Sequence, residues 1–240
     1  MGAQWKQKGR EQYALKRGQI VNKAVKEIHV AAKLGVPDPA NNARLFAAVE
    51  SAKKLSVPRD TIDRAIKKGA GLTDDKVVYE LVTYEGFAPA KVPVIVECLT
   101  DNRNRTAPEI RMLFKNGQLG AMGSVKWMFD HLGVVEATHP DKSTDIEAAA
   151  IEAGADNVEP LEPEDIPEGQ IGARFFCNPG GLDAVSKFLT AAKWTVSAAE
   201  MRYIAKNYVE LNDAQRKEVA DFLNAIDEHD DVHRVYAAIK

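Results

Sequence analysis

The feature that most constrains the fold is a change in the spacing of apolar residues close to residue 71. Before this point, apolar side chains recur every three or four residues, which is the spacing of one face of an α-helix. From residue 77 onward, short runs rich in β-branched residues replace that spacing, and turns containing glycine and proline separate them. The chain is therefore expected to have a helical N-terminal part, followed by a part with both strands and helices.

Three helices are expected in the first 70 residues. The first carries an apolar stripe and ends at Gly35, before Pro37. The stripe consists of Ile20, Val21, Ala24, Val25, Ile28, Ala31 and Ala32. The apolar face of the second helix consists of Leu45, Phe46, Val49, Ala52 and Leu55. A short third helix starts near Pro58 and ends at Gly69. Short links between the three predict a small bundle.

The rest of the chain is expected to alternate between strands and helices. The expected strands are 77–84, 92–99, 125–129, 134–138, 157–161, 171–177, 195–203, 207–211 and 232–238, and the expected helices are 107–116, 144–154, 181–192 and 213–227. From residue 134, the order strand, helix, strand, strand, helix, strand is that of a ferredoxin-like unit. The last strand can complete the sheet that the first two strands begin as a hairpin.

These elements predict an α+β fold class, with an N-terminal three-helix bundle followed by two ferredoxin-like α+β domains. The basic helical domain is expected at 1–72. The second domain is discontinuous, formed by 77–132 together with 205–240, and the inserted third domain is expected at 133–204.

The composition is that of a globular protein with a core, because 45% of the residues are hydrophobic and 28% are charged. No run of about 18 apolar residues is present, so no membrane-spanning helix is expected. The two cysteines, Cys98 and Cys177, form no Cys-x-x-Cys pair, and the first residues do not match a signal peptide. These observations predict a cytoplasmic protein with reduced thiols.

Positive charge is concentrated in the N-terminal part. Residues 1–70 contain 15 Lys and Arg against 6 Asp and Glu, whereas residues 71–240 contain 17 against 29. A basic part on an otherwise acidic chain is typical of a protein whose basic part meets phosphate. The alternative is a solvated helical surface whose charge merely offsets that of the rest of the chain.

The candidate nucleic-acid contacts in the basic part are one aromatic residue and a set of cations. Trp5 could stack on a base, and the cations could reach phosphates. The cations are Lys6, Lys8, Arg10, Lys16, Arg17, Lys53, Lys54, Arg59, Arg64, Lys67 and Lys68. Each is an ordinary surface residue by itself, so the prediction depends on their density. For those nearest the N-terminus, the alternative is a frayed, solvated leader.

A second candidate is the segment Thr-Asp-Asn-Arg-Asn-Arg-Thr at 100–106, between an expected strand and an expected helix. Thr106 and Glu109 match a capping box, so Thr106 is the expected N-cap. Arg103 and Arg105 would then lie beside a helix N-terminus, where backbone N–H groups and the helix dipole favour an anion. This arrangement predicts a phosphate clamp. The candidate contacts here are Asn102, Arg103, Asn104, Arg105 and Thr106. The alternative is that the arginines pair with acidic residues and brace a domain interface.

The segment Gly-Gln-Leu-Gly-Ala-Met-Gly-Ser at 117–124 is expected to be a loop. It follows a helix, so it is not a dinucleotide-binding fingerprint. Its glycines could let the backbone approach a ligand closely, and Ser124 is included among the candidate nucleic-acid contacts. Simple turn geometry is the favoured alternative.

No catalytic site, cofactor or metal is expected. Ser124 does not lie in a Gly-x-Ser-x-Gly motif, and no carboxylate pair stands out for acid–base chemistry. His229 and His233 are four residues apart and could share a metal on one helical face, but a strand expected from Val232 would break that spacing. An enzyme that holds a phosphorylated small molecule on the two arginines of 100–106 would lack a nucleophile or base.

Several of these segments resemble the YebC family of probable transcriptional regulators. They are Ala31–Lys33, Pro37–Pro39, Lys53–Gly71, Tyr84–Pro89, Thr100–Thr106, Gly123–Val125 and the acidic C-terminal end that leads to Val235 and Tyr236. The resemblance covers nearly the whole chain, and the run at 100–106 is highly specific. Many members begin with a Gly-His-Ser-Lys-Trp-like leader, whereas this chain has Gly-Ala-Gln-Trp-Lys at 2–6, so a role carried by that histidine is not expected here.

The resemblance implies three domains around a central cavity, one helical and two α+β, without catalytic activity or cofactor. Members are usually described as DNA-binding transcriptional regulators. Mitochondrial relatives are described as translational activators, and bacterial relatives are linked to ribosomes stalled on proline-rich nascent chains. The resemblance therefore implies a nucleic-acid partner and leaves two mechanisms open.

We therefore expect a non-enzymatic, nucleic-acid-binding regulator of gene expression, most simply a DNA-binding transcriptional regulator. The alternative is a translation factor that binds the ribosome or transfer RNA. No helix-turn-helix with an evident recognition helix stands out, and the acidic part of the chain would be repelled by a long duplex, which favours folded RNA. No membrane partner and no small-molecule substrate are expected.

Overall fold

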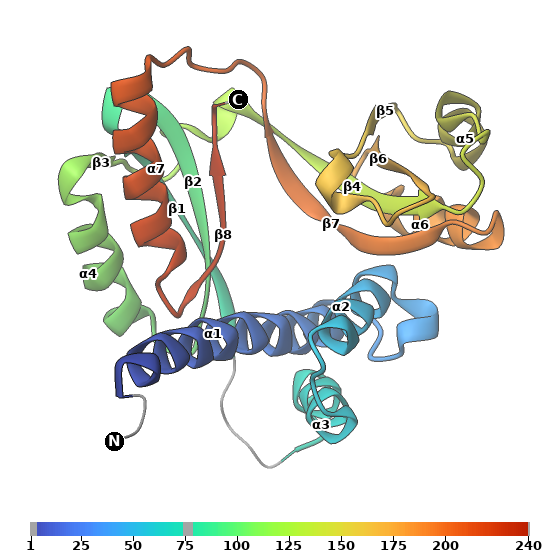
Figure 1. The fold of residues 1–240 in the computed structure, drawn as a ribbon, viewed down its shortest axis with the longest axis horizontal. Coiled ribbons are helices and arrows are strands. Elements are labelled where there is room, and N and C mark those ends of the chain that lie inside the picture. Colours follow the sequence, from blue (N-terminus) through green and yellow to red (C-terminus); the bar gives the residue numbers. More distant parts are fainter. Residues whose placement is uncertain (1–3, 74–78, 240) are drawn as a thin grey trace. The chain divides into compact units, whose positions relative to one another are not determined.

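The chain forms two compact units, Met1–Lys76 and Val77–Lys240. The structure, a computed structural model, describes residues 4–73 and 79–239, with side chains from Arg17 onward (Figure 1). Within these residues, no helix combines the length and the apolar character that a membrane span requires. The N-terminal unit is helical, and the second unit contains two four-stranded antiparallel sheets with their helices. The α+β fold class predicted from the sequence is therefore confirmed.

The N-terminal unit consists of α1 (Gln4–Leu34), α2 (Ala43–Lys54) and α3 (Arg59–Gly69). Helix α1 already begins at Gln4, so the first residues continue the helix that the sequence indicates only from Ile20. The core is largely the predicted one, but Ile20 is exposed and Phe46 is not among its members. Its buried members are Ile28, Ala31, Ala32, Leu45, Ala48, Val49, Ala52, Val57, Ile62 and Ala65.

Two local features determine how these helices meet. The Asn42 side chain caps α2 by accepting a hydrogen bond from the Leu45 N–H, and it donates to the carbonyls of Ala31 and Val36 at the end of α1. Helix α3 approaches α1 so closely that a Cβ atom on Gly69 would lie 2.3 Å from the His29 carbonyl oxygen. Only glycine fits at this crossing.

The first sheet of the second unit has the strand order β3-β1-β2-β8. Its strands are β1 (Glu80–Ala88), β2 (Val92–Thr100), β3 (Gln118–Leu119) and β8 (Val232–Ala237). All nine residues of the central strand β2 are buried. Helices α4 (Arg103–Leu113) and α7 (Asp213–Asp227) cover one face of the sheet, and Ile95 packs into a second cluster on the other face. As expected, the last strand returns to complete the sheet that the hairpin begins.

Three expected elements of this region are wrong in detail. Gly86 lies within β1 and pairs with Val94, so the hairpin turn is only the short 3-10 turn Pro89–Lys91. No strand forms at 207–211, where the Val209 N–H bonds the carbonyl of Ala238 without a ladder. Residues 126–128 form a 3-10 turn, so the expected strand at 125–129 begins only at its last residue. The first residues of the strand expected from 77 lie outside the described part of the chain.

The second sheet has the order β5-β6-β4-β7, which is the ferredoxin-like arrangement predicted from the sequence. Its elements are β4 (Phe129–His139), α5 (Ile146–Ala153), β5 (Asn157–Pro160), β6 (Ile171–Cys177), α6 (Leu182–Ala191) and β7 (Thr195–Ala205). The first sheet has a different order, because its two hairpin strands, β1 and β2, are neighbours in the centre of the sheet.

The two sheets share a small apolar cluster where β4 and β7 extend beyond α5 and α6. Its buried members are Ile95, Val125, Phe129, Tyr203 and Ala238. The rings of Tyr203 and Tyr236 pack edge to face in the same place. The division expected at residues 133 and 204 stays a prediction, because β4 and β7 run through both points.

Candidate nucleic-acid interface

The candidate cations of the N-terminal unit that follow α1 lie on α2 and α3. Lys53, Lys54, Arg59, Arg64 and Lys67 are all exposed, and Lys68 is half-buried. Two of them have carboxylate partners on their own helix: Lys53 contacts Glu50 at 2.7 Å, and the distance from Arg59 Nε to an Asp63 oxygen is 3.8 Å. Exposed pairs of this kind contribute little to stability.

Three cations of this set have no ion-pair partner among the described residues. They are Lys54, Arg64 and Lys67. Because exposed cations without a paired carboxylate keep their full charge toward solvent, this surface is suited to a phosphate backbone. Arg44, in the first turn of α2, has a structural role, since it forms a two-point ion pair with Glu27 of α1 at 2.6 and 3.1 Å.

The N-terminal candidates are only partly described. The side chains of Trp5, Lys6, Lys8, Arg10 and Lys16 lie outside the described residues, although their backbone belongs to α1. Arg17 is exposed. Farther along α1, His29 is buried, and burial together with the charges of Lys68 and Lys33 holds its pKa below the ordinary value. His29 is therefore neutral in the folded protein at pH 7.

The predicted N-cap at Thr106 is wrong. Helix α4 begins three residues earlier, and its N-cap is Asn102, whose Oδ1 accepts hydrogen bonds from the N–H groups of Asn104 and Arg105. Asn102 takes this role because its side chain sits directly after β2 in extended backbone, where an Asn oxygen can reach the first turn. The N–H groups expected to hold an anion are thus occupied by the protein itself.

Thr106 lies buried inside the helix and belongs to a polar network. Its hydroxyl donates to Oδ2 of Asp231 at 2.8 Å and lies 2.8 Å from the Thr100 hydroxyl. Asp231 also accepts from Arg105 at 3.1 Å, and this contact raises the pKa of Arg105. Arg105 therefore pairs with an acidic residue, as the alternative expects, but it ties α4 to the segment before β8 within the second unit, and Thr106 is buried.

Arg103 remains the more available of the two arginines. Its Nε lies 2.6 Å from a carboxylate oxygen of Glu80, and both side chains are at least half exposed. An exposed pair exchanges readily with another anion, because water screens it. Of the five residues expected at this segment, Arg103 and Asn104 face solvent without bracing the fold.

The glycine-rich loop has an organiser that sequence reasoning missed. Glu85, in β1, is only 4% exposed, and its carboxylate accepts hydrogen bonds from the N–H groups of Gly123, Val125 and Lys126 at 2.7, 3.0 and 2.8 Å. Burial by itself would raise the pKa of Glu85, but the three donors and the Lys126 charge outweigh it, so the pKa is lowered. The signal available in the sequence is a glutamate in the middle of a buried strand.

Two glycines make this loop possible. Gly123 has φ +85, a conformation that side chains disfavour. A Cβ atom on Gly120 would lie 2.3 Å from Ser124 Oγ. That hydroxyl oxygen is buried, so the structure does not support the predicted contact of Ser124 with nucleic acid. Turn geometry, the favoured alternative, accounts for this serine.

The residues that could hold a metal do not have the expected arrangement. His229 follows α7 and His233 lies on β8, so they share no helical face. One oxygen or nitrogen atom from each of Glu109, His229 and Asp231 lies within 4.8 Å of the others. Both ring nitrogens of His229 are engaged, since Nδ1 accepts from the Asp231 N–H and Nε2 lies 3.0 Å from Glu109. The group is explained by these hydrogen bonds.

Comparison with known proteins assigns both units of the chain to one family. Residues 2–72 match the family described as the TACO1/YebC protein N-terminal domain, and residues 79–239 match the one described as the TACO1/YebC second and third domain. The chain belongs to the TACO1/YebC family. The resemblance seen in the sequence is thereby confirmed over nearly its full length.

Relatives within the TACO1/YebC family match this chain from end to end. A protein of Bdellovibrio bacteriovorus is 51% identical over 241 residues, and the match covers 100% of both chains. One from Polaromonas sp. is 50% identical over 242 residues, covering 100% of this chain and 99% of the relative. Both carry the name "Probable transcriptional regulatory protein". The crystal structure of a conserved hypothetical protein from Aquifex aeolicus has a TM-score of 0.78 and 37% identity, covering 94% of this chain and 90% of that one.

Proposed function

We propose that this chain is a non-enzymatic regulator of gene expression that binds nucleic acid through its basic N-terminal unit. The observation that carries the proposal is the set of exposed cations on α2 and α3, of which Lys54, Arg64 and Lys67 have no ion-pair partner among the described residues. Phosphate contacts from such side chains supply most of the affinity of a protein for nucleic acid. The name shared by the relatives supports regulation of transcription as its setting.

Duplex DNA is the first candidate ligand. Helices α2 and α3 are joined by four residues, and α3 exposes Arg59, Arg64 and Lys67 along one side while it buries Ile62 and Ala65. Cations along one side of a short helix can follow a phosphate backbone. This surface supplies affinity and positioning, and specificity for a promoter would require base contacts in addition.

Structured RNA is the second candidate, with translation as the process regulated. The specific observation in its favour is the acidic remainder of the chain, in which residues 71–240 contain 29 Asp and Glu against 17 Lys and Arg. A long duplex passing this part would be repelled, whereas a compact folded RNA can present phosphates to the basic unit alone.

The first experiment measures affinity by fluorescence anisotropy for labelled duplex DNA and for a folded RNA, at several salt concentrations. The test variant is Lys54→Gln/Arg64→Gln/Lys67→Gln, and its control is Lys142→Gln/Lys187→Gln/Lys217→Gln, which removes the same charge from exposed positions of the second unit. The test variant is expected to lower the slope of log K against log salt by about 2 to 3, since each phosphate contact contributes roughly 0.7 to 0.9. Equal slopes for the test variant and the unmodified protein would refute the proposal.

A second experiment separates the two ligands. The tagged protein is sedimented from lysate through a sucrose gradient at low and moderate salt, with and without nuclease. Salt-sensitive migration with ribosomal particles that the test variant loses favours translation. Retention of a defined promoter fragment against excess competitor DNA, with the protein at the top of the gradient, favours transcription.

A further inference from the structure

The loop that joins β3 to β4 is held in one conformation by hydrogen bonds to Glu85 of β1. The backbone N–H groups of Gly123, Val125 and Lys126 all donate to the buried carboxylate of Glu85. The Gly120 N–H bonds the Glu85 carbonyl as well, at 2.8 Å. Charge-assisted hydrogen bonds of this kind are strong, so the loop is ordered before any ligand arrives.

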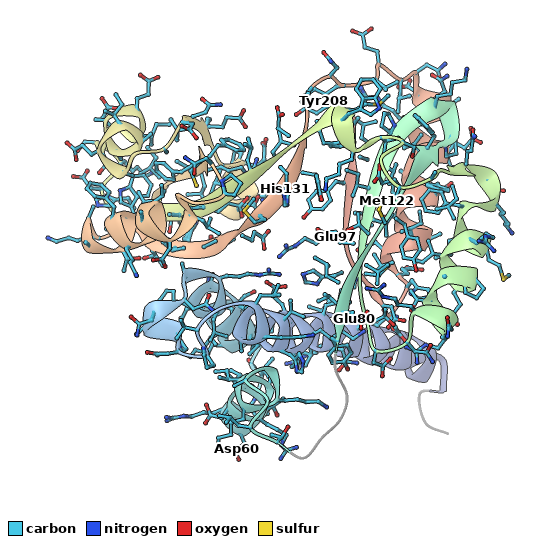
Figure 2. The ribbon with its side chains drawn as sticks, turned by 180° about the vertical axis from the view of Figure 1, so that it is seen from behind. Asp60, Glu80, Glu97, Met122, His131 and Tyr208 are labelled. Carbon is cyan, nitrogen blue, oxygen red and sulfur yellow. The ribbon has the colours of Figure 1, made fainter. Side chains whose placement is uncertain are left out.

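This ordered loop presents large apolar side chains to solvent. Met122 is 92% exposed and Trp127 is 65% exposed. Met122, labelled in Figure 2, lies in the turn that follows β3. The indole N–H of Trp127 donates to the Ser124 carbonyl at 3.1 Å. Because its one polar group is already bonded within the loop, the exposed part of the ring can interact only through its apolar surface. A fixed, exposed tryptophan of this kind is typical of a binding surface.

The charge around this loop selects the partner. The 20 residues between Glu109 and Asp130 contain no Asp or Glu, the longest such stretch in the chain, and they include Arg111, Lys115 and Lys126. The stretch lies within the part of the chain that is otherwise strongly acidic. An exposed aromatic ring in a positively charged, carboxylate-free segment is the combination that single-stranded nucleic acid requires.

Lys126 directly precedes Trp127 in the chain and is exposed. Its Nζ atom lies 5.7 Å from the centre of the Tyr203 ring, and the His131 ring stacks on the same Tyr203 ring with a centroid distance of 4.4 Å. Burial, together with the Lys126 charge, lowers the pKa of His131. Among the described residues no carboxylate lies within ion-pair distance of this ammonium group, whose charge also acts on the buried Glu85.

We propose that Trp127 and Lys126 form a second nucleic-acid contact, at which an unpaired base stacks on the indole ring and its phosphate meets the ammonium group. The inference rests on the proposed function only in taking nucleic acid as the ligand, because the site belongs to the second unit and uses none of the cations of α2 and α3. Bases in a duplex are covered on both faces by their neighbours. The site therefore selects single strands, loops or bulges, and not a continuous duplex.

The test uses the full chain with Trp5→Phe. Two tryptophans then remain, the exposed Trp127 and the buried Trp194. A 12-nucleotide oligouridine is expected to quench this fluorescence, and the same length of duplex is not. Because the Trp127 variants lack the reporting ring, their binding is measured by the anisotropy of labelled oligouridine. Trp127→Ala should weaken it about 5- to 150-fold, the range for one stacked base, with partial recovery in Trp127→Phe. Ile151→Ala, at an equally exposed apolar residue on α5, is the control and should bind like the parent.

The outcomes separate this inference from the proposed function. If Trp127→Ala binds oligouridine as tightly as the parent, the stacking site is refuted, whatever the α2–α3 variant does. If the α2–α3 variant binds normally while Trp127→Ala does not, the proposed function fails and the stacking site stands. An uncharged proline-rich peptide that quenches Trp127 where oligouridine fails would identify a peptide as the occupant and overturn the inference.

Discussion

The carboxylate of Glu85 accepts a 2.7 Å hydrogen bond from the backbone N–H of Gly123, a residue 38 positions later in the chain. This contact joins the hairpin of the first sheet to the loop that enters the second. The loop contains no long apolar run of its own, so its conformation depends on this one buried anion. Stability and the geometry of the exposed Trp127 are thereby coupled to the same residue.

Replacing Glu85 with Gln is expected to destabilise the protein by about 1 to 3 kcal/mol at pH 7. A glutamine has one acceptor oxygen in place of two, and its amide N–H₂ would face backbone donors that need an acceptor. Urea unfolding followed by circular dichroism measures the change. Glu80→Gln, at an exposed glutamate of the same strand, is the control and should stay within about 0.5 kcal/mol.

The effect of Glu85 should depend on pH with a definite sign. Its pKa is lowered in the folded protein, so its contribution is fully present above the unfolded value near 4.3 and is lost as pH falls through the lower folded value. The stability difference between the parent and Glu85→Gln is therefore expected to be constant from pH 6 to 8 and to shrink below about pH 4. A difference that grows on acidification would contradict the proposed role of the carboxylate.

The sequence was sufficient for the elements whose apolar spacing is regular. The helices at 213–227 and 182–191 and the strand at 171–177 lie within a residue of their expected positions, because burial on one face repeats along each of them. The expected strand at 207–211 failed for the opposite reason. Val209 and Leu211 pack on the core of the first sheet from a segment without regular structure. Over so few residues, the apolar spacing of such a segment looks the same as that of a strand.

The candidate site was harder to predict, because polar side chains compete for the same backbone groups. Thr106 and Asn102 are both good N-caps, and the choice depends on Asp231, which takes the threonine hydroxyl from 125 residues away. Such a distant partner leaves no trace in local spacing. The organising role of Glu85 was missed for the same reason, since its three donors lie on a loop far along the chain.

The network around Asp231 predicts different effects for the two arginines of α4. Arg105→Gln should lower the free energy of unfolding more than Arg103→Gln does, because it removes one donor from a buried carboxylate. Arg103→Gln should leave stability within about 0.5 kcal/mol, since its ion pair with Glu80 is exposed. Parallel urea titrations decide this. Equal losses for the two variants would mean that Arg105 does not brace α4.

Thr106→Val tests the same network from its buried side. Valine keeps the shape of threonine, but it leaves Oδ2 of Asp231 without the hydroxyl donor, so a loss of about 1 to 3 kcal/mol is expected. The matched control is Thr195→Val, at an exposed threonine at the start of β7, where valine is well tolerated in a strand. A Thr106→Val variant as stable as this control would show that the hydroxyl contributes nothing to the network.

The second sheet predicts a further stability effect at Glu136. This carboxylate lies on β4 and accepts from Arg174 of β6 at 2.9 Å and from Arg202 of β7 at 2.6 Å, and all three side chains are less than one third exposed. Glu136→Gln should cost about 1 to 3 kcal/mol, because two arginines lose their shared partner. Burial alone would raise the pKa of Glu136, but the two arginines outweigh burial, so the pKa is lowered. The stability that Glu136 contributes should therefore also be lost as pH falls through its pKa in the folded protein.

His29, in the N-terminal unit, is expected to make the free energy of unfolding depend on pH in a higher pH range than the two glutamates do. Burial and the charges of Lys68 and Lys33 lower its pKa, so the unfolded chain binds a proton more readily than the folded one. The stability associated with neutral His29 is therefore present above the unfolded value near 6.5 and is lost as pH falls below it. Urea unfolding at pH 7.5 and pH 5.5 should show a larger loss for the parent than for His29→Gln, which cannot take up that proton. A parent and variant whose difference is the same at both pH values would show that His29 does not titrate on unfolding.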